Sequence, residues 1–472
     1  MNYTDFIVVA PISFLTIISL AVLVTDALLK QREKISYWLT VFGLFFSMLL
    51  SLSSLDLTGS VFNRMVSVGG VGSLFSGLFA LAGLLTVMLS RDYLRKEEAM
   101  YGEYYLLILF STLGMLLMAT AADLIMIFLG LELMSICLYV LAGFFRRRPI
   151  SNESSLKYFL LGSFATGFLL FGIAFLYGAS GTTNIADIAG EFSSLTSSSI
   201  FWLGAGLFLI GLAFKVGAVP FHMWIPDVYQ GSPTTASGFM ATGAKAAAFS
   251  AFVIVFLRPE FSSAGKIKLV LALLSAASMI VGNVIAISQN NIKRMLAYSS
   301  IAHAGYMLAG LAAFNITGKN GVLFYLVAYT FMNIGAFGVL SILERQEEKN
   351  LTFDDYAGLG ARHPLIAALM SVFMFSLAGI PPFAGFFGKY YVFLAAVQSN
   401  LTWLAILGVL MSVVSLYYYL RLIVMMYFRD VQGETTGGFS LSGVIVLGII
   451  ALAVVGIGIY PSSILSLLTN LY

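Results

Sequence analysis

Residues 207–234 read LFLIGLAFKVGAVPFHMWIPDVYQGSPT, with Lys215 inside an otherwise apolar run. Gly217 and Pro220 follow within two turns, and a proline interrupts the hydrogen bonds of a regular helix. A second stretch, SLAGIPPFAGFFGKYYVF at 376–393, repeats the Gly-x-x-Pro-Phe pattern and carries Lys389 after its prolines. Both stretches therefore indicate an apolar helix that is broken close to a lysine.

The two patterns start 162 residues apart, which is about the length of five membrane spans with their loops. Five is an odd number, so the second copy enters the membrane from the opposite side. Broken helices at corresponding positions of two inverted halves are a strong sequence indication of an ion or substrate site. The pattern predicts an inverted repeat, although the two lysines stand on opposite sides of their prolines.

Composition sets the class of protein. Of the 472 residues 60% are hydrophobic and 10% are charged, whereas soluble domains carry about 25% charged residues. The single cysteine, Cys137, excludes a disulfide scaffold, and a net charge of +3 gives no indication of nucleic-acid binding. We expect an all-α polytopic membrane protein with about fourteen transmembrane helices. The spans are predicted at 6–28, 36–55, 71–90, 103–120, 122–144, 155–178, 200–219, 234–257, 268–288, 294–314, 321–343, 364–398, 402–428 and 441–465.

The charges of the loops predict the orientation, because cytoplasmic loops are enriched in Lys and Arg. If the first span starts outside, the cytoplasmic loops hold Lys30, Arg32, Lys34, Arg91, Arg95, Lys96, Arg146, Arg147, Arg148, Lys293, Arg294, Arg345, Lys349, Arg362 and Arg429. The outer loops then hold only Arg64, Arg258, Lys266, Lys268 and Lys319. We expect a multi-pass protein of a bacterial cytoplasmic membrane with both termini on the outer face.

Charged residues inside the spans are the candidate site, because charge within a bilayer is costly. The basic ones are Lys157, Lys215, Lys245, Lys389 and Arg421, and Glu132 is the acid nearest to a helix centre. Burial disfavours a charged ammonium group, and a carboxylate at about 6 Å opposes this by roughly 3 kcal/mol. A Glu132–Lys215 pair would thus act as a switch that holds a proton while closed and releases it, through water, when open. A row of Lys215, Lys245, His303 and Lys389 could carry that proton onward.

Structural alternatives exist for each of these residues. Glu132 and Lys215 could form a purely structural pair, and Lys245 could only satisfy carbonyls of a broken helix. Lys389, Lys157 and Arg421 could extend to a membrane interface. His303 could be a hydrogen-bonded core histidine. Nothing in the sequence has the spacing of a metal site.

Five motifs together resemble the antiporter-like membrane subunit family of proton-pumping NADH:quinone oxidoreductase (respiratory complex I). They are LGLELMSICLYVLAG with Glu132, the stretches of Lys215 and Lys389 above, SGFMATGAKAAA with Lys245, and IKRMLAYSSIAHAGYML with His303. The resemblance covers about residues 100–430 and is strongest to the N-subunit type. A lysine rather than a glutamate at 389 argues against the M subunit, and the absence of a C-terminal lateral helix argues against the L subunit.

The resemblance implies a domain organisation: helices 1–3 in 1–100, a five-helix bundle (helices 4–8) in 101–260, an inverted bundle (helices 9–13) in 261–430, and a last helix in 431–472. It implies a proton relay through Glu132, Lys215, Lys245 and Lys389, with a connecting role for Lys157.

The resemblance also implies the setting of that relay. The chain would be a non-redox subunit of the oxidoreductase, a translocase. Flavin (FMN), iron–sulfur clusters and quinone would lie on partner subunits, with M-type and small K-type subunits as neighbours in the bilayer. Two other functions are open at this stage: a subunit of a multisubunit Na⁺/H⁺ antiporter, which shares the same motifs, and a scaffold whose charges no longer conduct.

Overall fold

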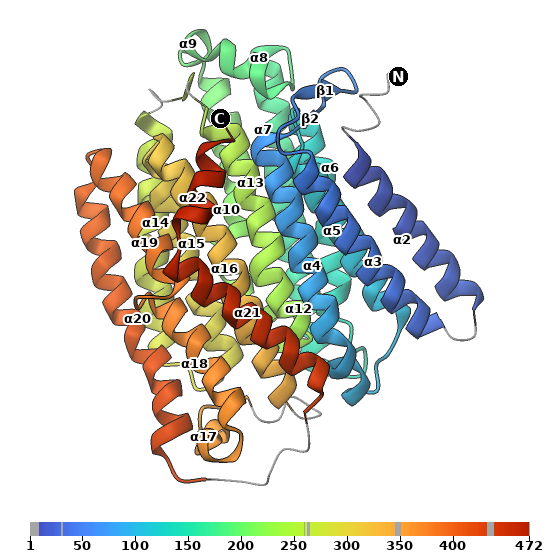
Figure 1. Ribbon diagram of the computed structural model, residues 1–472. Coiled ribbons are helices and arrows are strands. Elements are labelled where there is room, and N and C mark those ends of the chain that lie inside the picture. The colour runs from blue at the N-terminus through green and yellow to red at the C-terminus, as the bar shows by residue number, and fades with distance from the viewer. Residues whose placement is uncertain are drawn as a thin grey trace.

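The computed structural model describes residues 9–29, 32–258, 260–261, 265–344, 351–431 and 439–471. The long helices of this part are α2 (Ala10–Leu28), α3 (Arg32–Ser53), α4 (Gly70–Lys96), α5 (Gly102–Ala119), α6 (Leu124–Ala142), α7 (Pro149–Ser180), α10 (Ser199–Val216), α13 (Lys245–Phe256), α14 (Gly265–Ile287), α15 (Ile292–Ala312), α16 (Ile316–Leu343), α18 (Pro364–Ala378), α19 (Ala384–Gln398), α20 (Thr402–Phe428) and α21 (Leu441–Ile459). The short helices are α8 (Ile185–Gly190), α9 (Phe192–Leu195), α11 (Trp224–Gly231), α12 (Thr234–Phe239), α17 (Leu359–Arg362) and α22 (Ser462–Thr469). Figure 1 shows the long helices as one bundle.

The predicted fold class is confirmed. Within the described ranges, twelve helices are long and apolar enough to cross a membrane, or thirteen if the bent pair Asp354–Arg362 and Pro364–Ala378 is one span. Two further predicted runs are helical but do not meet this criterion. Polar residues lower the hydropathy of α15, and the run at 364–398 is divided into α18 and α19, each of 15 residues.

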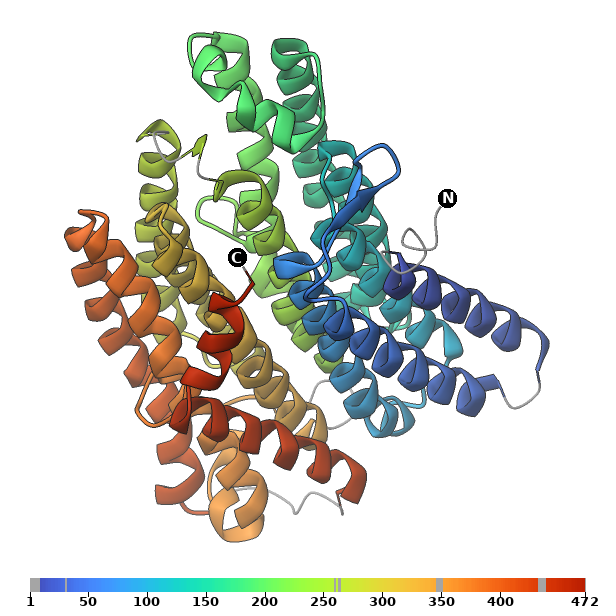
Figure 2. The same cartoon turned by 45° about the horizontal axis from the view of Figure 1, so that its top comes forward.

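The two halves of the chain lie beside each other in the bundle. Figure 2 shows the blue-to-green half next to the yellow-to-red half. Close approach of backbones holds neighbouring helices in place: a Cβ on Gly114 of α5 would lie 2.5 Å from the carbonyl oxygen of Gly130 on α6. Only glycine at this crossing lets α6 pack so tightly against α5, and this packing fixes the helix that carries Glu132.

One end of the bundle carries a small hairpin that the sequence does not predict. β1 (Gly59–Val61) pairs with β2 (Val66–Val68) in antiparallel register, and Arg64 in its turn forms a 2.9 Å ion pair with Asp187 of α8. Val9 packs against this hairpin, and Leu471 lies against Gly70 at the start of α4. We call this the hairpin end, and both ends of the described chain lie there.

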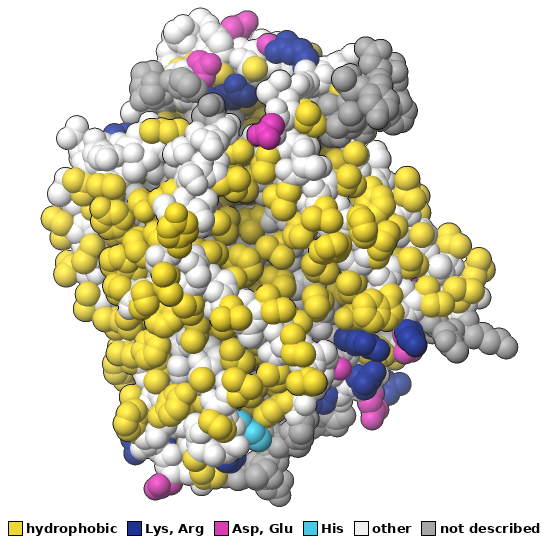
Figure 3. All heavy atoms as spheres, in the orientation of Figure 1, with side chains coloured by type: hydrophobic (Ala, Val, Ile, Leu, Met, Phe, Trp, Pro, Cys, Tyr) yellow, Lys and Arg dark blue, Asp and Glu magenta, His cyan; other side chains and the backbone are white. Residues whose placement is uncertain are grey.

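The opposite end is rich in Lys and Arg, and we call it the basic end. It includes the end of α4 with Arg95, α17 with Arg362, and the residues before α7, where Arg147 lines a cavity together with Glu97. Figure 3 shows hydrophobic side chains over the middle of the molecule, with most of the visible Lys and Arg at its lower edge. A wide apolar belt between two polar ends is the surface expected of a protein that spans a bilayer.

Candidate functional site

Both predicted helix breaks are present and share a local conformation. α10 ends at Gly217 and α18 ends at Gly379, each with a positive φ, +73° and +86°. A left-handed residue at a helix end favours glycine, because a Cβ would be strained there. The backbone carbonyls freed at such a break become available to polar side chains inside the bundle.

Lys215 occupies the last turn of α10 and is only 5% exposed. Its Nζ donates hydrogen bonds to Ser135 Oγ at 2.7 Å and to Tyr139 Oη at 3.2 Å, both on α6. The same nitrogen lies 5.2 Å from the centre of the Tyr139 ring and 5.7 Å from that of Tyr158. The lysine is thus held by hydroxyl oxygens and aromatic faces rather than by a carboxylate.

Glu132 lies on α6, three residues before Ser135, and accepts a 2.8 Å hydrogen bond from Thr166 Oγ1 of α7. It forms no ion pair with Lys215 within 4.0 Å but lies within electrostatic range of that lysine, so the switch expected from the sequence stays a prediction. The Lys215 nitrogen donates its shortest hydrogen bond to Ser135. Because residues three apart share a helix face, Ser135 is the natural bridge between the acid and the amine.

Lys245 lies at the centre of the bundle and is 1% exposed. It follows a π-helical turn, Met240–Ala244, between α12 and α13, and such turns are often found at functional sites. Its Nζ donates to the carbonyl oxygen of Ser300 on α15 at 2.7 Å and also contacts the Ser300 hydroxyl. Both contacts belong to the neighbouring helix α15, which is continuous at this position.

His303, on α15 and 1% exposed, has a hydrogen-bond partner on each ring nitrogen. Nδ1 lies 2.7 Å from Tyr325 Oη of α16, and Nε2 lies 3.1 Å from Tyr419 Oη of α20. Tyr419 also contacts the hydroxyl of Ser299. These hydrogen bonds fix the His303 ring in the core, and the relay role expected as the alternative stays a prediction.

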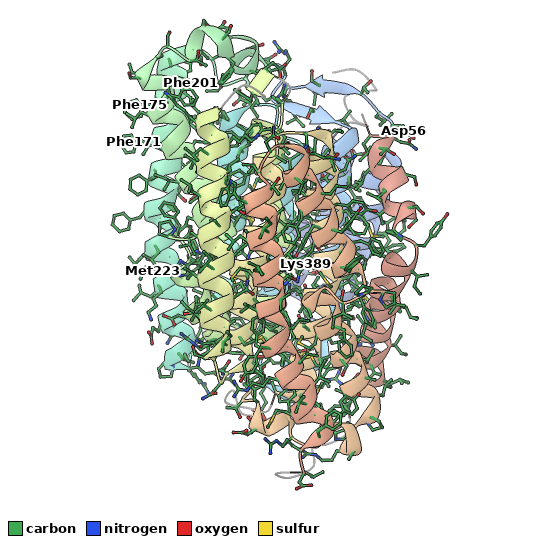
Figure 4. The ribbon with its side chains drawn as sticks, turned by 90° about the vertical axis from the view of Figure 1, so that its left-hand side faces the viewer. Asp56, Phe171, Phe175, Phe201, Met223 and Lys389 are labelled. Atoms are coloured by element: carbon green, nitrogen blue, oxygen red, sulfur yellow. The ribbon has the colours of Figure 1, made fainter. Side chains whose placement is uncertain are left out.

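Lys389 lies at mid-height in the bundle, as Figure 4 shows. Its Nζ donates to the Ala378 carbonyl at the end of α18 and to Ser412 Oγ of α20, both at 2.8 Å. It also lies 5.1 Å from the centre of the Tyr306 ring. The side chain turns toward the helix break and is 5% exposed, so it does not extend to an interface. A cavity of about 660 Å³ with apolar walls, between α19 and α20, reaches this lysine.

Lys157 differs from the other lysines because its side chain is 41% exposed. It pairs with Glu153 at 2.6 Å and with Asp227 of α11 at 2.7 Å, and Asp227 also pairs with Arg294 at 2.8 Å. Burial alone would raise the pKa of Asp227, but hydrogen bonds from Lys157 and Arg294 outweigh it and lower that pKa. Lys157 therefore joins α7 to α11 at the basic end and lies apart from the buried lysines.

Two other basic residues were assigned from the sequence, Arg421 to a span and Lys293 to a cytoplasmic loop. Arg421 extends toward the basic end, with hydrogen bonds to the Gln289 carbonyl and to Asn290 Oδ1. Lys293 was expected in a cytoplasmic loop, but it is fully buried and donates to the Ser232 carbonyl at 2.8 Å. The loop assignment was wrong because α15 already begins at Ile292, so Lys293 lies in its first turn and is packed inside the bundle.

The sequence did not indicate the hydroxyl groups that contact these charges. They are Ser135, Tyr139, Thr166, Ser300, Tyr325, Ser412 and Tyr419. A signal was available for two of them, because Glu132, Ser135 and Tyr139 follow an i, i+3, i+7 pattern on one face of α6. In the described part of the chain, no group of three or more His, Cys, Asp or Glu residues could hold a metal ion.

Comparison with known proteins assigns the family. Residues 121–415 match the family described as NADH:quinone oxidoreductase/Mrp antiporter, TM. NADH-quinone oxidoreductase subunit N of Trichlorobacter lovleyi is 47% identical over 97% of this chain and 95% of its own length. The chain belongs to the subunit N family.

Further subunit N relatives and solved structures agree with this assignment. The subunit N of Salinibacter ruber is 47% identical over 88% of the chain and 83% of its own length. A chain of respiratory complex I from Thermus thermophilus superimposes with a TM-score of 0.84 at 35% identity, over 97% of this chain and 98% of that one. A chain of the Mrp complex from Dietzia sp. has a TM-score of 0.87 over 98% of this chain and 96% of that one, but at 19% identity this likeness shows the fold alone.

Proposed function

We propose that the chain is a proton-translocating subunit of the membrane arm of an NADH:quinone oxidoreductase and that Glu132, Lys215, Lys245 and Lys389 carry the protons. One observation carries the proposal. Three lysines, each at most 5% exposed, lie inside the bundle with nitrogens bonded to neutral hydroxyl and carbonyl oxygens. A buried cation that forms no ion pair is costly. Charged residues inside a membrane are therefore rare, and those that occur usually belong to functional sites.

The first part of the relay follows from the geometry of α6. Glu132 is held by Thr166, and Lys215 is held by Ser135 one turn away. A small shift that moves the lysine nitrogen from Ser135 to Glu132 would stabilise the ammonium form, and the reverse shift would favour release of its proton. The hydroxyl of Ser135 can accept and donate, so it suits a position between the two states.

The second part of the relay crosses between helices of the second half of the chain. Lys245 contacts Ser300, His303 bridges Tyr325 and Tyr419, and Lys389 lies over Tyr306. His303 lies within electrostatic range of both Lys245 and Lys389. Water between these groups would complete a path from the centre of the bundle to the cavity beside Lys389.

The groups at the site favour protons over sodium ions. Na⁺, like other hard cations, is held by oxygen ligands such as carboxylates and carbonyls. Three of the four candidate carriers are lysines, whose ammonium groups repel a metal cation but exchange protons. The identity of 47% to an NADH-quinone oxidoreductase subunit N supports the oxidoreductase role over a Na⁺/H⁺ antiporter subunit.

The setting proposed for the subunit has four parts. The basic end faces the cytoplasm of a bacterial cell and the hairpin end faces outward, as the bias of basic residues indicates. Helices 4–8 and 9–13 form inverted bundles, for which the matching breaks at Gly217 and Gly379 give support. M-type and K-type subunits are the neighbours, and the apolar cavity beside Lys389 supports a lateral contact. FMN, iron–sulfur clusters and quinone reside on partner subunits.

The proposal is tested in the assembled complex, purified and reconstituted in liposomes. Glu132→Ala and Lys215→Ala should each strongly reduce proton pumping while the complex still assembles. Glu191→Ala and Lys266→Ala, which change exposed residues at the hairpin end, are the matched controls and should pump normally. Wild-type pumping by both relay variants would overturn the proposal.

A further inference from the structure

A buried cluster of charges at the basic end has no part in the relay described above. Glu97 follows α4 with a side chain 1% exposed, and Glu344 follows α16 and is also 1% exposed. Arg148 precedes α7 and pairs with Glu97. The cluster therefore joins the N-terminal helices, the first bundle and the second bundle at a single place.

The contacts around Glu344 hold the end of α16. Lys96 donates from Nζ to the carbonyl oxygens of Ser341 and Ile342, at 3.0 and 3.2 Å. Glu344 Oε2 accepts a hydrogen bond from the hydroxyl of Thr234, the first residue of α12. α12 leads through the π-helical turn to Lys245, so Glu344 contacts the start of the span that carries the central lysine.

Three buried atoms of the cluster lack a hydrogen-bond partner among the residues that the structure describes. They are Glu97 Oε1, Glu344 Oε1 and Arg148 Nη1. A cavity of about 490 Å³, lined by Glu97, Arg148 and the exposed Glu98, lies at the same place. A water molecule takes about 30 Å³ and needs polar partners, so this cavity can bring several waters to the buried carboxylate of Glu97.

Polar groups continue from Glu344 along one face of α16. Asn333 lies eleven residues before Glu344, which is about three helical turns, and Tyr329 lies one turn further. Both side-chain atoms of Asn333 and the hydroxyl of Tyr329 are buried without a partner in the described ranges. Tyr329 lies beside Ser300, the residue that holds Lys245, and its ring is 5.1 Å from that of His303.

We propose that the carboxylates of Glu97 and Glu344 form the proton-uptake site of this subunit at its basic end. A proton from water in the cavity binds a carboxylate, giving a neutral carboxylic acid. It then passes through water that the Asn333 amide orients and through the hydroxyl of Tyr329 to the neutral amine of Lys245, which becomes ammonium as the carboxylate is restored. The proposal rests on the relay proposed above and adds the group that supplies it.

The charges around the two acids suit this role. The titratable or charged groups of the described chain that face them are Lys96, Arg148, Tyr93 and Tyr356. Burial raises the pKa of Glu97 above its ordinary value, while Arg148 opposes this, so the acid is brought closer to the pH at which it can exchange a proton with water.

The test compares Glu344→Gln with Glu344→Asp in the reconstituted complex. Glutamine keeps an acceptor for Thr234 but cannot carry a proton, whereas aspartate can. Glu344→Gln should slow proton pumping by about tenfold or more, because a positioned proton carrier contributes about 100-fold or more and water supplies a partial bypass. Its pumping should also fall more steeply as the pH on the basic side rises. Glu344→Asp should recover a large part of the rate, and Glu98→Gln, in the same cavity, should pump normally.

Two outcomes overturn this inference. One is wild-type pumping by Glu344→Gln. The other is an equal loss in the Gln and Asp variants, which would mean that the residue only holds Thr234 and α12 in place. A parallel measurement on Lys215→Ala separates this inference from the relay: if Lys215→Ala is impaired and Glu344→Gln is not, only the uptake site fails.

Discussion

The buried lysines differ from ordinary ion-paired lysines in what their nitrogens touch. Lys215, Lys245 and Lys389 donate to serine and tyrosine hydroxyls and to backbone carbonyls. These oxygens are dipoles rather than full charges, so they position an ammonium without holding its proton as firmly as a carboxylate would. Under the proposed relay, the arrival or departure of one nearby charge would change the protonation of each lysine.

A substitution at Ser135 tests whether a hydroxyl group positions Lys215. The Ser135 hydroxyl accepts a hydrogen bond from Lys215 Nζ, so Ser135→Ala should leave the lysine poorly placed. A hydrogen bond to a charged group contributes about 1.5–3 kcal/mol, which corresponds to roughly a tenfold to hundredfold change in an equilibrium. We expect pumping to slow by about tenfold, as measured by proton release per NADH oxidised in liposomes.

Cys137→Ala is the matched control for this prediction, since it also removes one heavy atom from a buried position of α6. It should leave pumping unchanged. If Ser135→Ala pumps like Cys137→Ala, the serine does not position the lysine.

For single residues, the sequence predicts which lysines are buried better than it predicts the groups that contact them. In a chain with so few charges each buried lysine stands out, whereas serines and tyrosines are too common to single out. Glu344 and Lys293 were missed for a related reason: each lies at a helix end, where sequence alone does not separate a loop from a buried corner. The switch pair of Glu132 and Lys215 stays a prediction.

Among the helices, the break at Gly379 gives a lysine access to a backbone carbonyl, because Lys389 donates to the carbonyl of Ala378 at the end of α18. Gly379 has a φ of +86°, and a Cβ there would lie 2.9 Å from the Cδ atom of Lys389. Gly379→Ala should therefore cost about 1–2 kcal/mol from the left-handed conformation and should also displace the lysine. We expect a lower thermal midpoint of the solubilised complex together with slower pumping.

Gly206→Ala, in α10, is the control variant for Gly379→Ala. Gly206 has open space around its Cβ position, and alanine is favoured over glycine in a helix by about 1 kcal/mol. This variant should be as stable as the wild type or more so. A Gly379→Ala complex with unchanged stability and pumping would show that the break tolerates a side chain and does not control Lys389.

Hydrophobic runs locate the helices reliably, and the breaks follow from proline and glycine. Less was predictable where polar residues enter a helix or where short strands form. α15 carries Lys293, Arg294 and His303, so its span is set by tertiary packing rather than by hydropathy. The hairpin at 59–68 has only three residues in each strand, too few for a periodic pattern to show.

For the whole molecule, the bias of basic residues toward one end predicts the orientation of the chain in the membrane. We expect Arg147→Cys, at the basic end, to react with a membrane-impermeant maleimide only in inverted vesicles. Ser197→Cys, near α9 at the hairpin end, should react only in right-side-out vesicles. Both changes are made with Cys137→Ser so that the introduced thiol is the only one in this subunit. Labelling in the opposite pattern would reverse the orientation and place the uptake site on the outer face.

The relay as a whole is tested most directly at its centre, Lys245. The measurement is the number of protons pumped per NADH oxidised by the reconstituted complex that carries Lys245→Met, compared with Lys266→Met at the exposed hairpin end. Methionine has a similar length and no proton to give, so the relay predicts a lower ratio for Lys245→Met and an unchanged ratio for Lys266→Met. An unchanged ratio in a fully assembled Lys245→Met complex would contradict proton transfer through the buried lysines.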